Sequence, residues 1–137
     1  MKRRTLTILV ISFITLAIIW FLLSGRIIGK KPFKDINDSD VQSIGLLVIP
    51  PDKTISISER DEIKEIVDIL NTVVIYEEDD AGRQYQGQLV QYSLNMKDGN
   101  VVEIGSYNPF LFIDEKCYKT KYEPCEELNS LGNKLIK

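Results

Sequence analysis

Histidine is missing from this 137-residue sequence. It is the usual general base near neutral pH and the commonest zinc ligand, so its absence removes the most frequent catalytic and zinc-binding arrangements. The two cysteines, Cys117 and Cys125, are too far apart for the C-x-x-C pattern of a metal-ligand pair. A glycine-rich phosphate loop and the G-x-S-x-G and S-x-x-K patterns of serine nucleophiles are also absent. These absences predict a non-enzymatic protein with no catalytic residue, metal or cofactor.

Acidic residues are missing before Asp35, and residues 5–23 carry no charge. This uncharged run follows the basic tetrapeptide MKRR and, at about 1.5 Å per residue, gives a helix of roughly 30 Å, the thickness of a bilayer's hydrocarbon layer. We therefore interpret residues 5–25 as a transmembrane signal anchor behind a cytoplasmic tail, residues 1–4. From Lys30 onward, 13 basic residues stand against 20 acidic ones, a net charge of −7 that gives no electrostatic reason to bind nucleic acid.

A cleaved signal peptide has the same basic and apolar start and is the alternative to an anchor. Signal peptidase needs small residues at the first and third positions before its cut, where FLLSG offers Leu22 or Leu23. We therefore expect the segment to be retained in the cell membrane of a single-pass protein. Three bases at residues 2–4 nearly balance four bases between residues 26 and 34. The short N-terminal tail then favours a cytoplasmic N-terminus and an extracytoplasmic C-terminal domain.

Residues 26–40 are rich in turn-forming residues and are typical of a linker. Within them DINDSD resembles the start of an EF-hand loop, but Asp40 stands where glycine is required and Leu46 where glutamate is required. We therefore expect no calcium site. The rest of the chain, residues 41–137, predicts a single α+β domain with an antiparallel sheet of about five to seven strands and two packed helices.

Apolar and alternating runs predict where the strands and helices lie. The expected strands are residues 41–51, which two prolines terminate, 54–57, 73–76, 89–96, 110–114 and 117–122. A helix near residues 58–71 is indicated by a capping-box pattern, Ser58 with Asp61, and by an apolar stripe. The stripe consists of Ile63, Ile66, Val67 and Leu70. A second helix, near residues 124–136, begins with Pro124 and has along one side Cys125, Leu128, Leu131, Gly132 and Leu135.

The register of one hairpin follows from the alternation of residues 89–96. Leu94 lies on the apolar face of this strand, and Val102 must share that face on the next strand. The numbers of two paired residues must therefore add up to an even number such as 196. A two-residue turn gives an odd sum. We predict a three-residue loop, residues 97–99, with Gly99 in the left-handed conformation and a bulge.

Polar and aromatic side chains provide the candidate contacts. The candidate binding residues are Tyr107, Asn108, Tyr118 and Tyr122. The alternative for these three tyrosines, and for Tyr92, is a ring packed inward with its hydroxyl in water. The acidic run of residues 77–80 is typical of a solvated loop tip, with a cation or a basic partner as its alternative ligand.

Cys117 and Cys125 are predicted not to form a disulfide. If residues 117–122 are a strand, its ends lie roughly 16 Å apart, and the helix with Cys125 begins at the far end. A disulfide needs Cα atoms within about 7 Å. Alternation places Cys117 beside Lys119 on the wetter face, so we expect one exposed and one buried thiol. The alternative, a redox pair or a nucleophile, requires the strand assignment to be wrong.

Three segments, IPPDKTISI, YNPFLFID and YKTKYEPCEELN, resemble a family of small extracytoplasmic domains of unknown function. That family belongs to low-GC Gram-positive bacteria and is carried behind a transmembrane or lipoprotein anchor. The resemblance spans about residues 32–136, nearly all of the part outside the membrane; Cys125 matches the family and Cys117 departs from it. It implies an extracytoplasmic location and supplies no activity and no site residues.

Two functions follow from these observations as hypotheses. The leading one is a non-catalytic extracytoplasmic binding or sensing domain whose partner is a protein, a peptide or a cell-wall component. The alternative is an accessory or structural subunit of a membrane complex that contacts its partner through the transmembrane helix. Deletion of residues 1–29 discriminates the two, because only a binding domain keeps its partner when it is soluble.

Overall fold

The computed structural model describes residues 2–23 and 28–137. Gly25, the expected end of the anchor, and Arg26, one of the flanking bases, lie outside the described residues, as does Met1. In chain order the elements are α1 (Lys2–Leu23), η1 (Asp38–Asp40), β1 (Val41–Ile49), β2 (Lys53–Ile57), α2 (Arg60–Leu70), β3 (Ile75–Glu78), η2 (Asp80–Gln84), β4 (Leu89–Met96), β5 (Val101–Tyr107), β6 (Phe110–Ile113), β7 (Lys116–Thr120) and α3 (Tyr122–Leu135).

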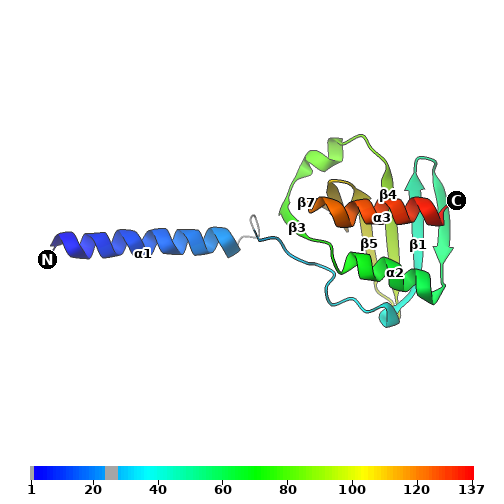
Figure 1. The fold of residues 1–137 in the computed structure, drawn as a ribbon, viewed down its shortest axis with the longest axis horizontal. Helices are drawn as coiled ribbons and strands as arrows, with labels where there is room; N and C mark the ends of the chain where they lie inside the picture. Colours follow the sequence, from blue (N-terminus) through cyan, green and yellow to red (C-terminus); the bar gives the residue numbers. More distant parts are fainter. Residues whose placement is uncertain (1, 24–27) are drawn as a thin grey trace.

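The strands form one seven-stranded sheet in the order β2-β1-β4-β5-β6-β7-β3. Every neighbouring pair is antiparallel, and β2 and β3 are the two edges. Helices α2 and α3 lie side by side across one face of this sheet, as Figure 1 shows. The predicted α+β class, with an antiparallel sheet and two packed helices, is therefore confirmed.

The core lies between the two helices and the sheet. The predicted apolar stripe of α2 is confirmed, and the side chains of α3 that face the sheet are also buried. The fully buried side chains from the sheet that meet them include Ile44, Leu46, Val48, Val90, Tyr92, Leu94, Ile104 and Leu111. The predicted capping box is wrong, because α2 begins at Arg60 after Glu59, and no side chain caps it. Arg60 instead donates through Nη2 to the carbonyl oxygen of Val41, 2.9 Å away, which holds the start of the helix against the sheet.

The predicted register of the β4–β5 hairpin is confirmed, since Leu94 pairs with Val102. Residues 97–99 form the loop, and the amide of Met96 donates to the carbonyl oxygen of Asn100 across 2.8 Å. Gly99 has the positive φ that this loop requires, 91°. The expected bulge is also present: the amide of Gly99 donates to the carbonyl oxygen of Met96 at 3.0 Å, so Gly99 and Asn100 both lie opposite Met96.

Several element boundaries differ from their predictions, among them those of β3 and β7, which meet at one edge of the sheet. The strand expected at residues 73–76 begins two residues later, because Val73 is buried directly after α2 and the chain joins β7 only from Ile75. The strand expected at residues 117–122 ends at Thr120, and Tyr122 already opens α3. Between them the amide of Lys121 donates to the carbonyl oxygen of Val74, 3.0 Å away.

The segment expected to be a linker is partly docked onto the domain. Lys30 and Ile75 exchange two backbone hydrogen bonds, of 2.7 and 2.8 Å, at the edge formed by β3. Phe33 is 3% exposed and belongs to the core. Six residue steps separate Leu23, the end of α1, from Gly29, and a chain of that length spans at most about 20 Å. The domain is therefore tethered closely to the end of α1.

Helix α1 has the length and composition of a membrane span. The most apolar stretch of 18 residues within Arg3–Leu23 has a mean hydropathy of 2.8, and none of its residues is buried. Figure 1 shows α1 apart from the sheet and its helices. An exposed apolar helix of this length requires an apolar environment, so α1 is a candidate membrane anchor.

Candidate functional site: a pocket on the open face of the sheet

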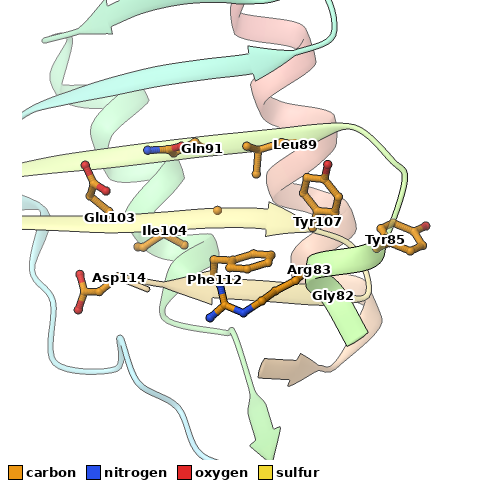
Figure 2. Close-up of a pocket in the computed structure, with 11 residues that line it drawn as sticks. Gly82, Arg83, Tyr85, Leu89, Gln91, Glu103, Ile104, Tyr107, Phe112 and Asp114 are labelled. Atoms are coloured by element: carbon orange, nitrogen blue, oxygen red, sulfur yellow. The ribbon is translucent and has the colours of Figure 1, made fainter. Parts of the chain in front are cut away.

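The sheet has one face covered by helices and one open face. On β4 the even-numbered residues Tyr92 and Leu94 are buried beneath α2 and α3. The odd-numbered residues point to the other side, where Gln91 pairs with Gly105 and Ser93 pairs with Glu103. The segment around η2 lies over one end of this open face, as the positions of Gly82, Arg83 and Tyr85 in Figure 2 show. A binding site on this side therefore has a sheet for its floor and η2 for one wall.

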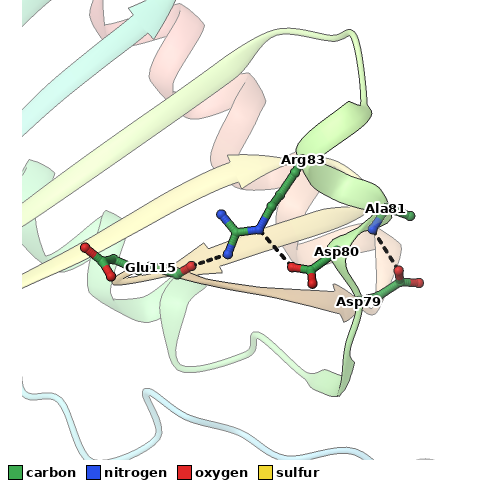
Figure 3. Close-up of polar contacts among 5 residues, drawn as sticks. All are labelled: Asp79, Asp80, Ala81, Arg83 and Glu115. Carbon is green, nitrogen blue, oxygen red and sulfur yellow. Dashed lines mark hydrogen bonds and ion pairs between the residues drawn. The ribbon is translucent and has the colours of Figure 1, made fainter.

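The segment around η2 is held in place by the acidic run that precedes it. Asp79 accepts the amide hydrogen of Ala81 through Oδ1 at 2.9 Å, as Figure 3 shows. Its Oδ2 lies 3.1 Å from Nζ of Lys119 on β7. The Ala81 hydrogen bond, and after it the Lys119 hydrogen bond, lower the pKa of Asp79. The remaining acids of the run also face the chain's own bases: Glu77 with Lys119, Glu78 with Lys116, and Asp80 with Arg83.

Gly82 makes the closest approach of η2 to the sheet. A Cβ added there would lie 2.4 Å from Sγ of Cys117 and 2.8 Å from Cγ of Phe110. Real Cβ atoms do not approach other atoms so closely, so the backbone of η2 lies against β6 and β7 only because this residue has no side chain. The contact carries Arg83 and Tyr85, which follow, to the wall of the pocket.

The resulting pocket has a volume of about 400 Å³, within the usual range for small-molecule and side-chain sites. Figure 2 shows its lining: Gly82, Arg83, Tyr85, Leu89, Gln91, Glu103, Ile104, Gly105, Tyr107, Phe112 and Asp114. Gly105 lies on the floor between Leu89 and Phe112, since a Cβ there would lie 3.2 Å from Cδ1 of Leu89 and 3.4 Å from Cβ of Phe112. The sheet and η2 thus form a hollow that both apolar and polar groups line.

Aromatic rings form one side of this pocket. The ring centroids of Tyr85 and Tyr107 are 5.7 Å apart at an interplanar angle of 72°, and those of Tyr107 and Phe112 are 6.1 Å apart at 80°. Tyr85 also contacts Phe110, with centroids 5.8 Å apart. Such edge-to-face contacts stabilise one another beyond the burial of their area. The rings therefore form a preformed wall and do not present a single flat surface.

The charged groups of the pocket differ in how they are engaged. Arg83 donates through Nε to Oδ1 of Asp80 at 2.8 Å and through Nη2 to the carbonyl oxygen of Glu115 at 2.5 Å (Figure 3). The side chains of Glu103 and Asp114 are exposed. Within the described residues, we find no hydrogen bond or ion pair to either carboxylate. Figure 2 shows both at the end of the pocket away from Tyr85.

Both cysteines are free and buried, which confirms the absence of a bond between them and corrects one expectation. Cys125 belongs to the core beneath α3, as predicted. Cys117 lies on the open face, as its strand parity requires, but it is 2% exposed because Gly82 covers it. The expectation of an exposed Cys117 is therefore wrong. Burial raises the pKa of Cys117, although nearby Arg83 opposes this shift, so the thiol stays neutral near pH 7.

The four candidate binding residues do not come together at one site. Tyr107 lines the pocket. Tyr118 lies on the opposite face, half-buried against the core. Asn108 donates through Nδ2 to Oε2 of Glu126 at 2.9 Å, and the hydroxyl of Tyr122 contacts the same carboxylate at 3.4 Å. These last two residues therefore form a small polar cluster at the start of α3.

For Tyr92 the alternative expectation is a ring packed inward with its hydroxyl in water. The structure does not place this hydroxyl in water. The ring is fully buried, and the hydroxyl donates to the carbonyl oxygen of Leu128 at 2.6 Å. Burial raises the pKa of Tyr92. The hydroxyl is satisfied inside the core because α3 leaves this carbonyl group within reach.

Most of the pocket was not predicted, although part of its signal is present in the sequence. The same sum of 196 that pairs the apolar residues also pairs Gln91 with Gly105. The register therefore predicts that a small residue, Gly105, lies between polar and aromatic side chains on the open face of the sheet. Arg83 and Tyr85 have no such signal, because their position depends on how the segment after β3 folds back.

No protein-family model matches this chain, and comparison with curated proteins and with solved structures gave no match.

Proposed function

We propose that this chain is a single-pass membrane protein whose C-terminal domain lies outside the cytoplasm and binds a ligand without catalysing a reaction. The single observation that carries the proposal is the pocket on the open face of the sheet, with aromatic side chains next to unpaired polar ones. Concave sites with apolar walls and a few polar groups are the usual form of a ligand site. The ligand belongs to a peptide, a protein or a cell-wall component.

A non-catalytic role is supported by the groups that the pocket offers. Its charged side chains, Arg83, Glu103 and Asp114, are all exposed. Nucleophilic catalysis needs an activated nucleophile beside a base, and the chain has no histidine for that base. The two thiols are buried, and burial raises the pKa of both. These features favour recognition over chemistry.

The anchor and the tether support a site close to the membrane surface. Helix α1 is long and apolar enough to span the bilayer, and the short basic tail before it favours a cytoplasmic N-terminus. The chain from Leu23 to Gly29 spans at most about 20 Å, and Gly29 already lies against β3. A ligand bound by this domain is therefore held near the outer leaflet.

A helix exchange tests the proposal against an accessory subunit that works through α1. Residues 2–23 are replaced by an unrelated transmembrane segment, and proteins crosslinked to the chain in intact cells are compared with those of the unaltered chain. We expect the same crosslinked partners, because the binding surface is retained. A chain that keeps α1 but lacks the residues from Lys30 onward is the matched control. This chain should lose the crosslinked partners. The opposite pattern would assign the contact to α1 and refute a binding domain.

A further inference from the structure

The pocket carries an excess of negative charge at one end. Within the described part of the chain, Arg83 is the only cation that lines the pocket, and Asp80 neutralises this charge through the 2.8 Å ion pair. Glu103 and Asp114 have no such partner among the described residues. The part of the chain from Lys30 onward has a net charge of −7, these two carboxylates included. The local potential therefore attracts a cation and repels an anion.

The aromatic wall is compatible with a cation as well. The guanidinium carbon of Arg83 lies 5.8 Å from the centroid of the Phe112 ring, within the range of a cation–π contact. Leu89 and Phe112, which lie close to Gly105 on the floor, offer apolar contacts. A suitable ligand thus has an apolar stem that lies along the rings and a positively charged head that reaches the two carboxylates. A basic side chain has this form.

The geometry of the rings distinguishes a peptide from an amino sugar. A sugar ring stacks on a flat aromatic surface, but Tyr85, Tyr107 and Phe112 meet edge to face at 72° and 80°. They form a narrow wall that suits a chain of methylene groups. In and beside the pocket the open face has short or flexible polar side chains, Gln91 and Ser93, which leave room for an extended backbone.

We propose that the pocket binds the lysine side chain of a peptide, with its methylene groups along Phe112 and Tyr107 and its ammonium group at Glu103 and Asp114. This inference rests on the proposed binding function and names the ligand class of that same pocket. Two exposed carboxylates opposite one ammonium group together contribute roughly 3- to 30-fold in affinity.

The test uses the full chain in detergent micelles and five-residue peptides that are acetylated and amidated, so that only the central side chain is charged. Binding of a lysine, a norleucine and a glutamate peptide is measured by calorimetry, together with glucosamine as the amino-sugar probe. We expect the lysine peptide to bind about 3- to 30-fold more tightly than the norleucine peptide, the glutamate peptide to bind more weakly still, and the lysine affinity to fall as salt rises.

Paired variants locate the effect. Glu103→Gln with Asp114→Asn should remove the preference for lysine over norleucine. Asparagine tolerates the positive φ of Asp114, 52°, so the turn is kept. The control pair, Asp52→Asn with Glu59→Gln, removes two exposed charges away from the pocket, one of them also at a positive φ, and should keep the preference.

Three outcomes would overturn the inference. Equal binding of the lysine and norleucine peptides refutes charge selection but leaves a binding pocket, so the proposed function survives. Binding of glucosamine without the peptides refutes the ligand class. No binding of any probe refutes the inference as well, while the helix exchange judges the proposed function independently.

Discussion

Gly82 lies directly over Cys117 and Phe110, so a methyl group at this position tests how η2 closes the pocket. The added Cβ of Gly82→Ala would lie 2.4 Å from Sγ of Cys117 and 2.8 Å from Cγ of Phe110. Neither neighbour is the free end of a flexible side chain, so η2 must move away from the sheet. Overpacking of this kind costs about 1 to 3 kcal/mol of unfolding free energy. The same movement uncovers the Cys117 thiol.

Two measurements on residues 28–137 check this prediction. Urea unfolding should give the loss of about 1 to 3 kcal/mol, and iodoacetamide should label Cys117 faster in the variant than in the unaltered domain. Gly45→Ala is the matched control on the same open face, because its Cβ would lie 3.6 Å from Cβ of Ser93, an ordinary contact. Equal stability and equal labelling of Cys117 in Gly82→Ala would show that η2 does not cover this thiol.

Three further predictions concern the core and the capping of η2. Leu70→Ala should cost about 2 to 4 kcal/mol in urea unfolding, since the side chain is fully buried; a loss below about 0.5 kcal/mol would place this face outside the core. Tyr92→Phe should cost about 0.5 to 1.5 kcal/mol, because the hydrogen bond from the buried hydroxyl to the carbonyl oxygen of Leu128 is lost; no change in urea unfolding of the variant would argue against this hydrogen bond. The pKa of Asp79 is lowered, mainly by the Ala81 hydrogen bond, so the charged carboxylate stabilises the folded state. This stabilisation is present above the ordinary pKa of 3.8 and is lost as the pH falls through the lower pKa of the folded state. Asp79→Asn should therefore be less stable than the unaltered domain at pH 7, with the difference shrinking below about pH 4; a difference that is constant with pH would contradict this.

Regular elements were predictable from the sequence wherever one face is buried. The stripe that includes Ile66 and Leu70 gave helix α2, because a helix with one apolar side must bury it. The pairing of Leu94 with Val102 followed from alternation, because a slip by one residue would put every apolar side chain in water.

The candidate site was far less predictable, because strand parity tells which face a residue occupies and not what covers that face. Cys117 was assigned correctly to the side of Lys119, yet η2 buries it. The fold of η2 depends on long-range contacts, such as Gly82 against β7 and Asp79 against Lys119. The docking of Phe33 was missed for the same reason, since one aromatic residue among turn-forming ones has no periodic pattern.

Site-specific photo-crosslinking in intact cells tests most directly whether the ligand binds on the open face. A photoreactive phenylalanine analogue replaces Tyr85 at the rim of the pocket, Tyr122 at the start of α3, or Phe13 in α1. Tyr122 is the control. Its side chain is 58% exposed, against 41% for Tyr85, so exposure alone would give more crosslinked product from the Tyr122 position. We expect a crosslinked ligand from the Tyr85 position and none from Tyr122. Adducts that form only from the Phe13 position would contradict the account and place the contact in the membrane.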